Sequence, residues 1–524
     1  MIKINNACPI LSTDEARGIE ASLLVDAVAE WSAMETAGRG IAAGILRDFQ
    51  ELKPLPDGPR VLVLVGKGHN GGDALLAAAE IMARHPRSKV LCLLTAKPDA
   101  MKALTLRAWE SVEGRVQLEM LGSESSVELL KRFDDLSGGK GFDICLDGIL
   151  GLSFKPPLDE RLFNLVQAIN DYPQIGLRAA VDMPTGLGEM DSSISFSVDF
   201  TYATGSVKKM HLEGGRACGR VRWVDLGFFE QGSAKASNEY FLTDAILNPL
   251  RQLRPSMVDK RNFGHLFIVG GSSNMPGALL MSVQAAVRSG VGRVTAFAPQ
   301  SMAASLAAQV PEAMWIPWPE SENGTLSPRA LPLLMQRLPA ATAVLLGPGM
   351  GRDRNTAQLA QEIVGQVTLP VICDADALSL RVVEFVQKRK AEWGPVVLTP
   401  HMGEFMRIAA LEHPTFDSEF LIDFCRKNRV ALVLKLPQTR CSDGESVYCN
   451  TFGGAVLSRG GSGDLLAGLI GGNLAQAKGR EFDAVMRAVV WHGKAAEVLA
   501  RKRGQIAVRT TDVLGYLSEV LRSN

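Results

Sequence analysis

The apolar positions of this chain are grouped into short uninterrupted runs, and helix-like or polar stretches separate most of them. In the N-terminal half, these runs lie at residues 61–66, 89–94, 142–150, 177–186, 198–204 and 221–228. A short continuous apolar run is typical of a strand buried on both faces, as in a parallel sheet between two helical layers. The alternation of such strands with helices predicts a doubly wound α/β domain that ends near residue 230.

The same pattern resumes after a mixed, weakly periodic stretch at residues 231–259. The predicted strands of the C-terminal half lie at residues 265–271, 293–299, 343–349, 369–376, 395–400 and 431–437. Gly, Pro, Asp or Thr residues close these runs, at the carboxyl ends where α/β proteins build their sites. We therefore predict two α/β domains, at residues 1–230 and 256–524, joined by a linker at 231–255.

The segment before the first strand is predicted to be helical. Residues 12–15 (STDE) have the pattern of a capping box, in which a serine and a glutamate satisfy the first free amides of a helix. The helical region extends to about residue 52, because the proline-rich stretch 53–59 ends it.

Composition limits the classes of partner. The 524 residues include 56 Lys+Arg and 56 Asp+Glu, so the formal charge is zero and neither nucleic acid nor a membrane surface is expected. No uncharged apolar run is long enough for a membrane-spanning helix, and the N-terminus lacks the apolar core of a signal peptide. The eight cysteines are scattered without a C-x-x-C pair, which favours reduced thiols in a cytoplasmic protein over a metal cluster.

A glycine-rich loop precedes a carboxylate near the C-terminus. Gly460, Gly461 and Gly463 lead to Asp464 and an apolar run that can begin a helix there. A helix start binds an anion through its free amides and its positive dipole end. If that anion is a transferring phosphoryl group, Asp464 can take the proton from the attacking hydroxyl. The alternative is that Asp464 only caps the helix.

Several motifs of the C-terminal half are similar to one family in both order and spacing. They are NMPGA (274–278), LGPGMG (346–351), CDADAL (373–378), LTPHMGEF (398–405) and RGGSGDLLAG (459–468). They resemble the NAD(P)H-hydrate dehydratases, a branch of the ribokinase-like fold, over about residues 250–520. The N-terminal half resembles the NAD(P)H-hydrate epimerases over about residues 10–230, through AMETAG (33–38), VGKGHNGGDALLAA (65–78), LDGILG (146–151) and VDMPTGL (181–187). The resemblance implies a Rossmann-like three-layer domain followed by a ribokinase-like domain.

The dehydratase resemblance implies that the substrates are NADHX and NADPHX, which are NADH and NADPH hydrated at a ring double bond. The added hydroxyl would be phosphorylated by ADP or ATP with Mg²⁺, ADP being favoured, and phosphate would then leave. Asp464 would be the base, and the amides of Gly461, Ser462 and Gly463 would stabilise the phosphoryl oxygens. The remaining implied contacts are Ala278, Gly349 and His401 to the hydrated cofactor, and Lys435 and Thr439 to the nucleotide.

Each implied contact also has a purely structural interpretation. Ala278 can pack at a helix start, Gly349 can turn the chain, and His401 can be a surface residue in the first turn of a helix capped by Thr399. Asp374 and Asp376 either face the site or cap the next helix. The chain also departs from the family at KLPQT (435–439), where Leu436 replaces a glycine and Pro437 removes an amide donor.

In the N-terminal half, HNGGD (69–73) follows a strand and precedes a helix, as in a phosphate-binding turn, although a tight structural turn has the same pattern. The epimerase resemblance implies that His69, Asn70, Gly71, Gly72, Asp73, Gly151 and Asp182 contact the substrate. It also implies a potassium site at Asn70, Asp147 and Thr185. Asp182 is the candidate for proton transfer, the alternative being an aspartate that merely ends a strand before a proline turn.

Three hypotheses remain open from the sequence. The chain has both repair activities, or it is a single-activity ribokinase-like kinase, or it is a dehydratase whose N-terminal domain is a degenerate binding module. NMPGA and PHMGE argue against the second, and the departures from the epimerase motifs at Ala74 and Leu152 motivate the third. Members of these families often assemble, so a homo-oligomer also stays open.

Overall fold

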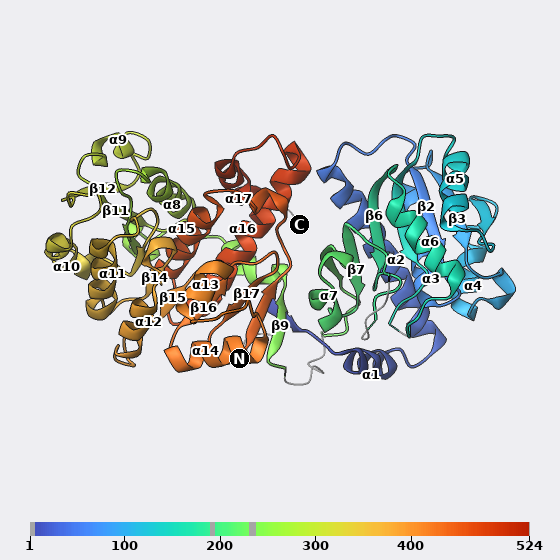
Figure 1. The fold of residues 1–524 in the computed structure, drawn as a ribbon, viewed down its shortest axis with the longest axis horizontal. Coiled ribbons are helices and arrows are strands. Elements are labelled where there is room, and N and C mark those ends of the chain that lie inside the picture. Colours follow the sequence, from blue (N-terminus) through green and yellow to red (C-terminus); the bar gives the residue numbers. More distant parts are fainter. Residues whose placement is uncertain (1–5, 153, 189–193, 230–236, 523–524) are drawn as a thin grey trace. The chain divides into compact units, whose positions relative to one another are not determined.

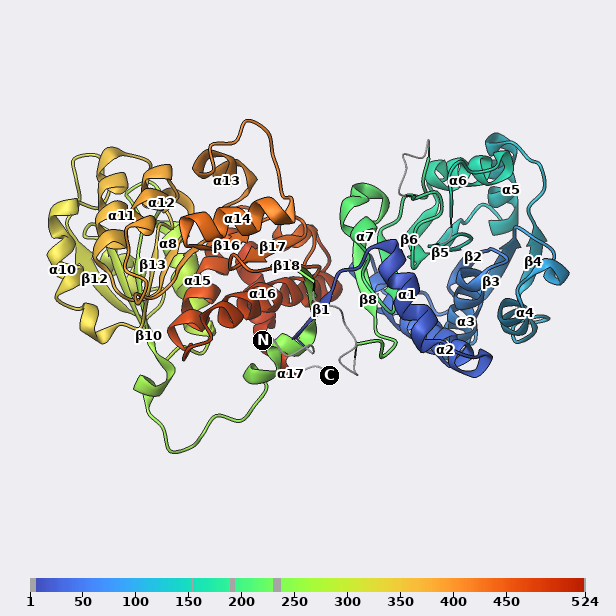
Figure 2. The ribbon, with the colours of Figure 1, turned by 90° about the horizontal axis from the view of Figure 1, so that it is seen from below.

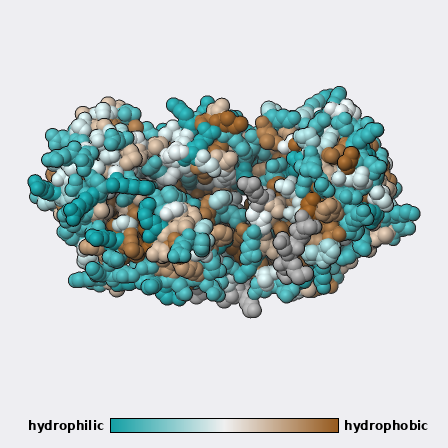
Figure 3. Space-filling model, in the orientation of Figure 1, coloured by the Kyte–Doolittle hydropathy of each residue, from teal (hydrophilic) through white to brown (hydrophobic). Residues whose placement is uncertain are grey.

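The computed structural model describes residues 6–152, 154–188, 194–229 and 237–522 (Figure 1). The chain forms two compact units. One unit is Pro9–Lys235, and the other is Ala236–Asn524 together with the N-terminal residues through Cys8. Teal hydrophilic side chains cover most of the visible surface of both units (Figure 3).

The N-terminal unit is built on one sheet with the strand order β4-β3-β2-β5-β6-β7-β8, in which every neighbouring pair is parallel. The strands are β2 (Arg60–Val65), β3 (Lys89–Leu94), β4 (Gln117–Met120), β5 (Phe142–Gly148), β6 (Ile175–Val181), β7 (Phe200–Thr204) and β8 (Arg220–Val224). The helices are α1 (Thr13–Leu23), α2 (Ala27–Asp48), α3 (His69–Arg84), α4 (Ala103–Glu110), α5 (Ser126–Ser137), α6 (Glu160–Asp171) and α7 (Lys209–Glu213).

Alternate residues of each central strand pack on opposite helical layers. Val61 and Val63 belong to a core shared with α2, α3 and α4, whereas Leu62 and Leu64 belong to a core shared with α5 and α6. Because helices cover both faces of the sheet, both sets of alternating side chains are apolar, and each strand is a continuous apolar run in the sequence. The predicted Rossmann-like three-layer domain is confirmed.

The N-terminal helices and one edge strand of this unit differ from the prediction. The capping box of Ser12 and Glu15 is confirmed, but the helical region after it is two helices, because the Asp26 carboxylate caps α2 by accepting from the amides of Val28 and Ala29. Strand β4 was not predicted, since its sequence QLEM lies at the sheet edge, is largely exposed and shows no apolar run.

The sheet of the C-terminal unit has the order β1-β9-β18-β17-β16-β15-β14-β13-β10-β11-β12. Its strands are β1 (Ala7–Pro9), β9 (Glu239–Leu242), β10 (His265–Val269), β11 (Arg293–Pro299), β12 (Met314–Trp318), β13 (Ala343–Leu346), β14 (Val371–Cys373), β15 (Val396–Leu398), β16 (Ala431–Leu434), β17 (Thr439–Ser442) and β18 (Val447–Asn450). From β12 to β16 neighbouring strands are parallel, while β16, β17 and β18 form an antiparallel meander.

Helices cover both faces of this sheet, with α15 and α16 on one side and α11, α12 and α14 on the other (Figure 2). The helices are α8 (Pro276–Arg288), α9 (Ala303–Ala307), α10 (Leu331–Met335), α11 (Arg354–Gln366), α12 (Leu380–Gln387), α13 (Met402–Ile408), α14 (Ser418–Asn428), α15 (Ser462–Ala475), α16 (Glu481–Arg503) and α17 (Leu517–Arg522). Short 3-10 helices include η9 (Ala375–Ala377) and η11 (Thr510–Tyr516). This doubly wound architecture is the one predicted for the C-terminal domain.

The strand order reverses once in each unit. In the N-terminal unit β2 has β3 on one side and β5 on the other, and in the C-terminal unit β10 lies between β11 and β13. At such a switch point the loops leave the sheet in opposite directions and open a crevice at the carboxyl ends of the strands. The fold therefore places one candidate crevice in each unit.

Candidate active sites

The crevice of the C-terminal unit brings together the loops after β10 and β13. Gly349 has φ of +65°, and a Cβ atom there would lie 2.4 Å from the Met275 carbonyl oxygen and 3.0 Å from the Ala278 Cβ. The turn and the close approach both require glycine. Ala278, in the first turn of α8, is thus the direct neighbour of Gly349, and the two predicted contact residues share one wall.

Asp464 projects from the first turn of α15, beside this wall. The helix begins at Ser462, two residues earlier than expected, and its N-cap is Gly461 with φ of +89° and no side-chain cap. The alternative in which Asp464 is the N-cap is therefore wrong. The Ser282 hydroxyl of α8 donates to the Asp464 carbonyl oxygen at 2.9 Å, which fixes this turn against α8 and leaves the Asp464 carboxylate to other uses.

The Asp464 carboxylate has an unusual proton affinity. Burial and the neighbouring Asp374 carboxylate raise the pKa of Asp464 to about 7, while the Lys435 ammonium group opposes the rise. The Asp376 carboxylate also raises the pKa of Asp464, by less than Asp374 does. A carboxyl group that titrates near neutral pH is matched to taking and releasing a proton during catalysis.

Lys435 connects the end of β16 to the helix start. Its Nζ donates to the Asp374 Oδ1 at 2.8 Å and lies 3.2 Å from the position a Cβ atom would take on Gly463. Burial disfavours the ammonium ion, but the Asp374 carboxylate outweighs it, so the pKa of Lys435 is raised. A fixed positive charge thus adjoins the first-turn amides of α15, where an anion is bound most favourably.

The side chains of the two aspartates after β14 make no capping hydrogen bond to the helices that follow. Asp374 is the N-cap of η9 without a side-chain cap bond, and its Oδ1 accepts from both Lys435 and the Thr399 hydroxyl. Asp376 accepts from the Gly351 amide at 3.0 Å and from the Arg352 Nε at 3.1 Å. The two carboxylates therefore fix the position of the Lys435 ammonium group and of the loop at Gly351 near Asp464.

His401 is itself the N-cap of α13. Its Nδ1 accepts from the Glu404 amide at 3.2 Å, and the Glu404 carboxylate accepts from the His401 amide at 2.9 Å. The expectation that Thr399 caps this helix is wrong, because the Thr399 hydroxyl is committed to Asp374 at 2.6 Å. The His401 side chain remains 57% exposed and accessible to a ligand.

Thr439, the other predicted nucleotide contact, is the first residue of β17. Its hydroxyl donates to the Leu436 carbonyl oxygen at 3.3 Å across the KLPQT turn. The Thr439 hydroxyl therefore closes the turn, although this chain lacks the glycine that the family has there. Lys435 and Thr439 flank the same turn, and their contact with a nucleotide stays a prediction.

In the N-terminal unit, α3 begins immediately after β2 and carries the HNGGD motif in its first turn. A Cβ atom on Gly71 would lie 2.0 Å from the Gly66 carbonyl oxygen, and one on Gly72 would lie 2.7 Å from the Met34 sulfur. His69 lies at the first position of the helix, and partial burial together with the Lys102 charge lowers its pKa. The motif is a helix start with close backbone contacts, which can bind an anion.

Asn70, Asp147 and Thr185 surround the loop after β5. The Asn70 Nδ2 donates to the carbonyl oxygens of Leu150 at 3.1 Å and Val181 at 2.9 Å, and the Leu150 amide donates to the Thr185 Oγ1. A Cβ atom on Gly151, in this loop, would lie 2.4 Å from the Asn70 Oδ1. Side-chain and carbonyl oxygens thus converge around Leu150.

Asp147 is fully buried in this cluster. Its carboxylate accepts from the Thr185 amide and hydroxyl, each at 2.7 Å, and from the Ile149 amide at 3.1 Å. Burial raises the pKa of Asp147 to about 6, although these hydrogen bonds lower it. Its hydrogen-bond partners among the described residues are amides and a hydroxyl. A cation held by neighbouring oxygen atoms would favour its ionised form.

Asp182 lies at the other side of the same crevice, directly after β6. It has φ of +55°, a region that a non-glycine residue rarely adopts. Its Oδ1 accepts from the buried Lys208 Nζ at 2.5 Å and from the Thr204 hydroxyl at 3.2 Å, and its carbonyl oxygen contacts the His211 Nε2 at 2.6 Å. Such strain at an over-determined position is typical of functional sites.

Two further carboxyl groups interact with this pair. Burial raises the pKa of Asp73 well above its ordinary value, and the charges of Asp182 and Glu20 add to the rise. Burial likewise raises the pKa of Glu20, which Lys208 partly offsets. Sequence reasoning placed Asp73 and Asp182 here. It missed Glu20 and His211, which come from α1 and α7.

Comparison with known proteins decides the family. Residues 266–519 match the NAD(P)H-hydrate dehydratase family, and residues 31–210 match the family described as YjeF-related protein N-terminus. The bifunctional NAD(P)H-hydrate repair enzyme Nnr of Gloeobacter violaceus is 33% identical over 538 residues, covering 98% of this chain and 97% of that protein. The chain belongs to the bifunctional NAD(P)H-hydrate repair enzymes.

Another member of this family of repair enzymes, Nnr of Moorella thermoacetica, is 31% identical over 509 residues, covering 94% of this chain and 92% of that protein. Among solved structures, the ADP/ATP-dependent NAD(P)H-hydrate dehydratase from Bacillus subtilis, co-crystallized with ATP/Mg²⁺, is 25% identical. The match covers 54% of this chain and 97% of that chain, with a TM-score of 0.45. In the part of the repair enzyme that the structure describes, no helix has the length and apolarity to cross a membrane.

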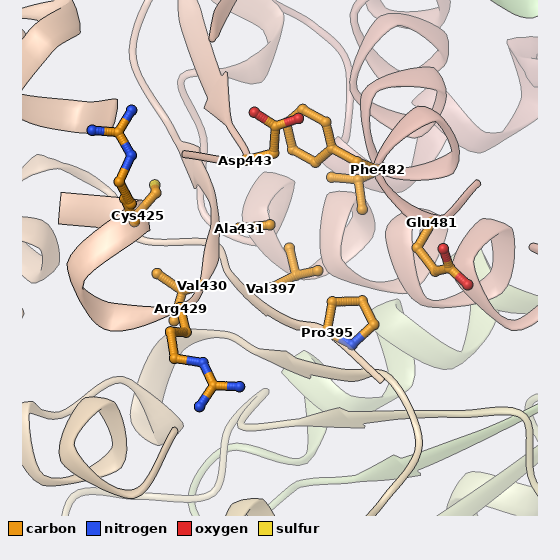
Figure 4. A pocket seen from close by; sticks show the side chains of 11 residues that line it. Pro395, Val397, Cys425, Arg429, Val430, Ala431, Asp443, Glu481 and Phe482 are labelled. Atoms are coloured by element: carbon orange, nitrogen blue, oxygen red, sulfur yellow. The ribbon is translucent and has the colours of Figure 1, made fainter. Parts of the chain in front are cut away.

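The repair enzyme also has a cavity of about 450 Å³ that is remote from the candidate site of its unit (Figure 4). Pro395, directly before β15, and Val397 within it line the cavity, as do Val430, directly before β16, and Ala431 at its start. These residues lie at the amino ends of strands whose carboxyl ends carry the candidate residues, such as Lys435. The cavity is therefore at the opposite edge of the sheet from Asp464.

Proposed function

We propose that this protein repairs hydrated NADH and NADPH with two active sites, one in each unit. The C-terminal unit dehydrates the S form in a nucleotide-dependent reaction, and the N-terminal unit interconverts the R and S forms. The observation that carries the dehydratase assignment is Asp464, a carboxyl group with a pKa of about 7 at the start of a helix and beside a buried lysine.

The dehydration proceeds in two steps. Asp464 removes the proton from the ring hydroxyl, whose oxygen attacks the terminal phosphorus of the nucleotide while the bond from that phosphorus to the bridging oxygen breaks and the shortened nucleotide leaves, AMP from ADP or ADP from ATP. Lys435 and the first-turn amides of α15 stabilise charge on the phosphoryl oxygens. The ring carbon–oxygen bond then breaks, phosphate leaves with both bonding electrons, and loss of a ring proton restores the double bond. Phosphate is a far better leaving group than hydroxide, which explains the need for a nucleotide.

We propose ADP as the favoured phosphoryl donor. Mg²⁺ accompanies nucleotide phosphoryl transfer in general, and it usually binds phosphate oxygens, water and one or two carboxylates. The Asp374 Oδ1 and both oxygens of Asp376 already hold protein donors. These contacts favour a magnesium ion held mainly through the phosphates of the nucleotide.

For the epimerase, Asp182 is the proposed group for proton transfer. Its partner Lys208 is fully buried, so the pair keeps a carboxylate at a fixed position in the crevice. Asp73, whose raised pKa favours the neutral acid, supplies a second carboxyl group nearby that can donate a proton.

We propose that the oxygen cluster of Asn70, Asp147 and Thr185 binds potassium. Hard oxygen donors suit this ion, and a cation would offset the burial of Asp147. The three residues named from the sequence lie together around the loop after β5, which supports the proposal. All eight cysteines are free and buried, which supports the proposal of a reducing, cytoplasmic environment.

A feeding experiment tests the two activities together. The purified chain receives R or S hydrate with ADP or ATP, and recovery of dihydronicotinamide absorbance is followed. We expect both epimers to be consumed. Recovery from the S form alone would mean that the N-terminal unit is a binding module. Recovery from neither, with another alcohol phosphorylated instead, would identify a different ribokinase-like kinase.

A further inference from the structure

A second cavity in the C-terminal unit adjoins the candidate dehydratase site. It has a volume of about 810 Å³ and lies between the outer face of α8 and the segment that leads from α16 into η11. Gly277, Met281, Gln284 and Arg288 line it from α8. Their spacing of three or four residues places them in one stripe along the helix.

This groove begins where the catalytic crevice ends. Gly277 directly precedes Ala278, which forms the wall of the crevice with Gly349. Met281 lies against the N-cap of α15, because a Cβ atom on Gly461 would lie 2.5 Å from its sulfur. On the opposite side, the Thr510 hydroxyl donates to the Gly460 carbonyl oxygen at 2.9 Å. The groove and the site therefore share the glycine loop and the start of α8.

The groove carries surplus positive charge. Arg503 and Arg509 line it and share one carboxylate, Asp512, at 3.8 Å and 3.3 Å. Arg288 lines it from α8, is exposed, and has no ion-pair partner among the described residues. Three guanidinium groups against one carboxylate leave a net charge of about +2. Arginine groups of this kind bind phosphate with good geometry.

The length of the groove matches the far half of a dinucleotide. From Gly277 to Arg288 the helix advances about 16 Å, at roughly 1.5 Å per residue. A nicotinamide ring held near Ala278 leaves the pyrophosphate and adenosine of the same molecule to extend outwards. The phosphates of the cosubstrate already have Lys435 and the start of α15, so a second cationic surface is left for the substrate itself.

We propose that this groove binds the adenosine half of the hydrated dinucleotide, and that Arg288 with Arg503 recognises its 2′-phosphate. The proposal rests on the proposed dehydratase function. It makes NADPHX the better substrate, because only NADPHX carries the phosphate that meets the surplus charge. The shared chemistry is a nucleotide phosphate, whose two possible sources are the substrate and the cosubstrate.

The test compares Arg288→Gln and Arg503→Gln with the wild type in steady-state dehydration of S-NADPHX and S-NADHX. We expect kcat/KM for NADPHX to fall by at least about ten-fold in Arg288→Gln, since a hydrogen bond to a charged group contributes roughly one factor of ten or more. The values for NADHX and the KM for ADP should stay near those of the wild type. Arg337→Gln, an exposed arginine at the opposite edge of the sheet, is the matched control.

A direct binding measurement separates this proposal from the proposed function. Adenosine 2′,5′-bisphosphate should bind to the wild type in calorimetry and bind weakly to Arg288→Gln, whether or not turnover occurs. Equal loss for both hydrates, an altered KM for ADP, or unchanged binding of the bisphosphate would overturn the proposal. A wild type that binds the bisphosphate but dehydrates neither hydrate would instead contradict the proposed function.

Discussion

Asp464→Asn is the substitution that examines the dehydratase mechanism most directly. With a pKa of about 7 in the folded protein, Asp464 is half ionised at pH 7. It is roughly one-tenth ionised at pH 6 and nine-tenths ionised at pH 8, so kcat/KM should rise about ten-fold over this range. The asparagine variant cannot accept the proton, so we expect it to lose roughly 10²–10⁴ of the activity and all of this pH-dependent rise.

The same substitution has a predictable effect on stability. The pKa of Asp464 is raised from 3.8 in the folded state, so the folded protein binds more protons than the unfolded chain between these two pH values. Stability is therefore full at low pH and falls as the pH rises towards 7. Asn removes the buried charge, so its thermal midpoint at pH 8 should equal or exceed that of the wild type.

The assay measures initial rates with S-NADPHX and ADP from pH 6 to pH 8, together with thermal unfolding at each pH. Glu419→Gln, an exposed first-turn acid of α14, is the matched control and should alter neither quantity. Near-normal turnover in Asp464→Asn, or a rise with pH that persists in it, would refute the assignment of the base. A midpoint well below that of the wild type would show that the carboxylate has a structural role.

Three further predictions follow from the geometry of the two sites. Lys435→Met removes the cation that lowers the pKa of Asp464, so the rising limb of the pH–rate profile should move to higher pH and the KM for the nucleotide should increase. Asp182→Asn should stop R-to-S conversion while dehydration of S continues, as chiral separation of residual hydrate would show. Potassium should raise both epimerase activity and the thermal midpoint of the wild type, whereas Asp147→Asn should show neither response in a titration against lithium.

The strands that could be predicted from the sequence are those whose two faces are both covered. Runs such as Val61–Val65 and Val344–Leu346 are wholly buried, so selection for apolar residues acts on every position. The strands that were missed are short or carry polar residues. They include β17 (TRCS), where Arg440 reaches the Phe416 carbonyl oxygen, and β9, which lies inside the predicted linker and pairs with β18.

The candidate site residues that the sequence could predict lie immediately after a strand or at the start of a helix. Asp374, His401, Lys435 and Asp464 meet this condition, because chain direction alone brings the carboxyl ends of neighbouring parallel strands together. Glu20 does not meet it. It lies on α1, far along the chain from Asp182, and only tertiary packing places it near the crevice.

The two sites solve one electrostatic problem in different ways. In each crevice a carboxylate must stay near the substrate despite burial. Asp182 is paired at 2.5 Å with the fully buried Lys208, which holds its carboxyl group in place. Lys435 instead pairs with Asp374 and only moderates the proton affinity of Asp464. The proposed dehydratase base can thus exchange its proton near pH 7, whereas the proposed epimerase mechanism uses a second carboxyl group, that of Asp73, as the proton donor.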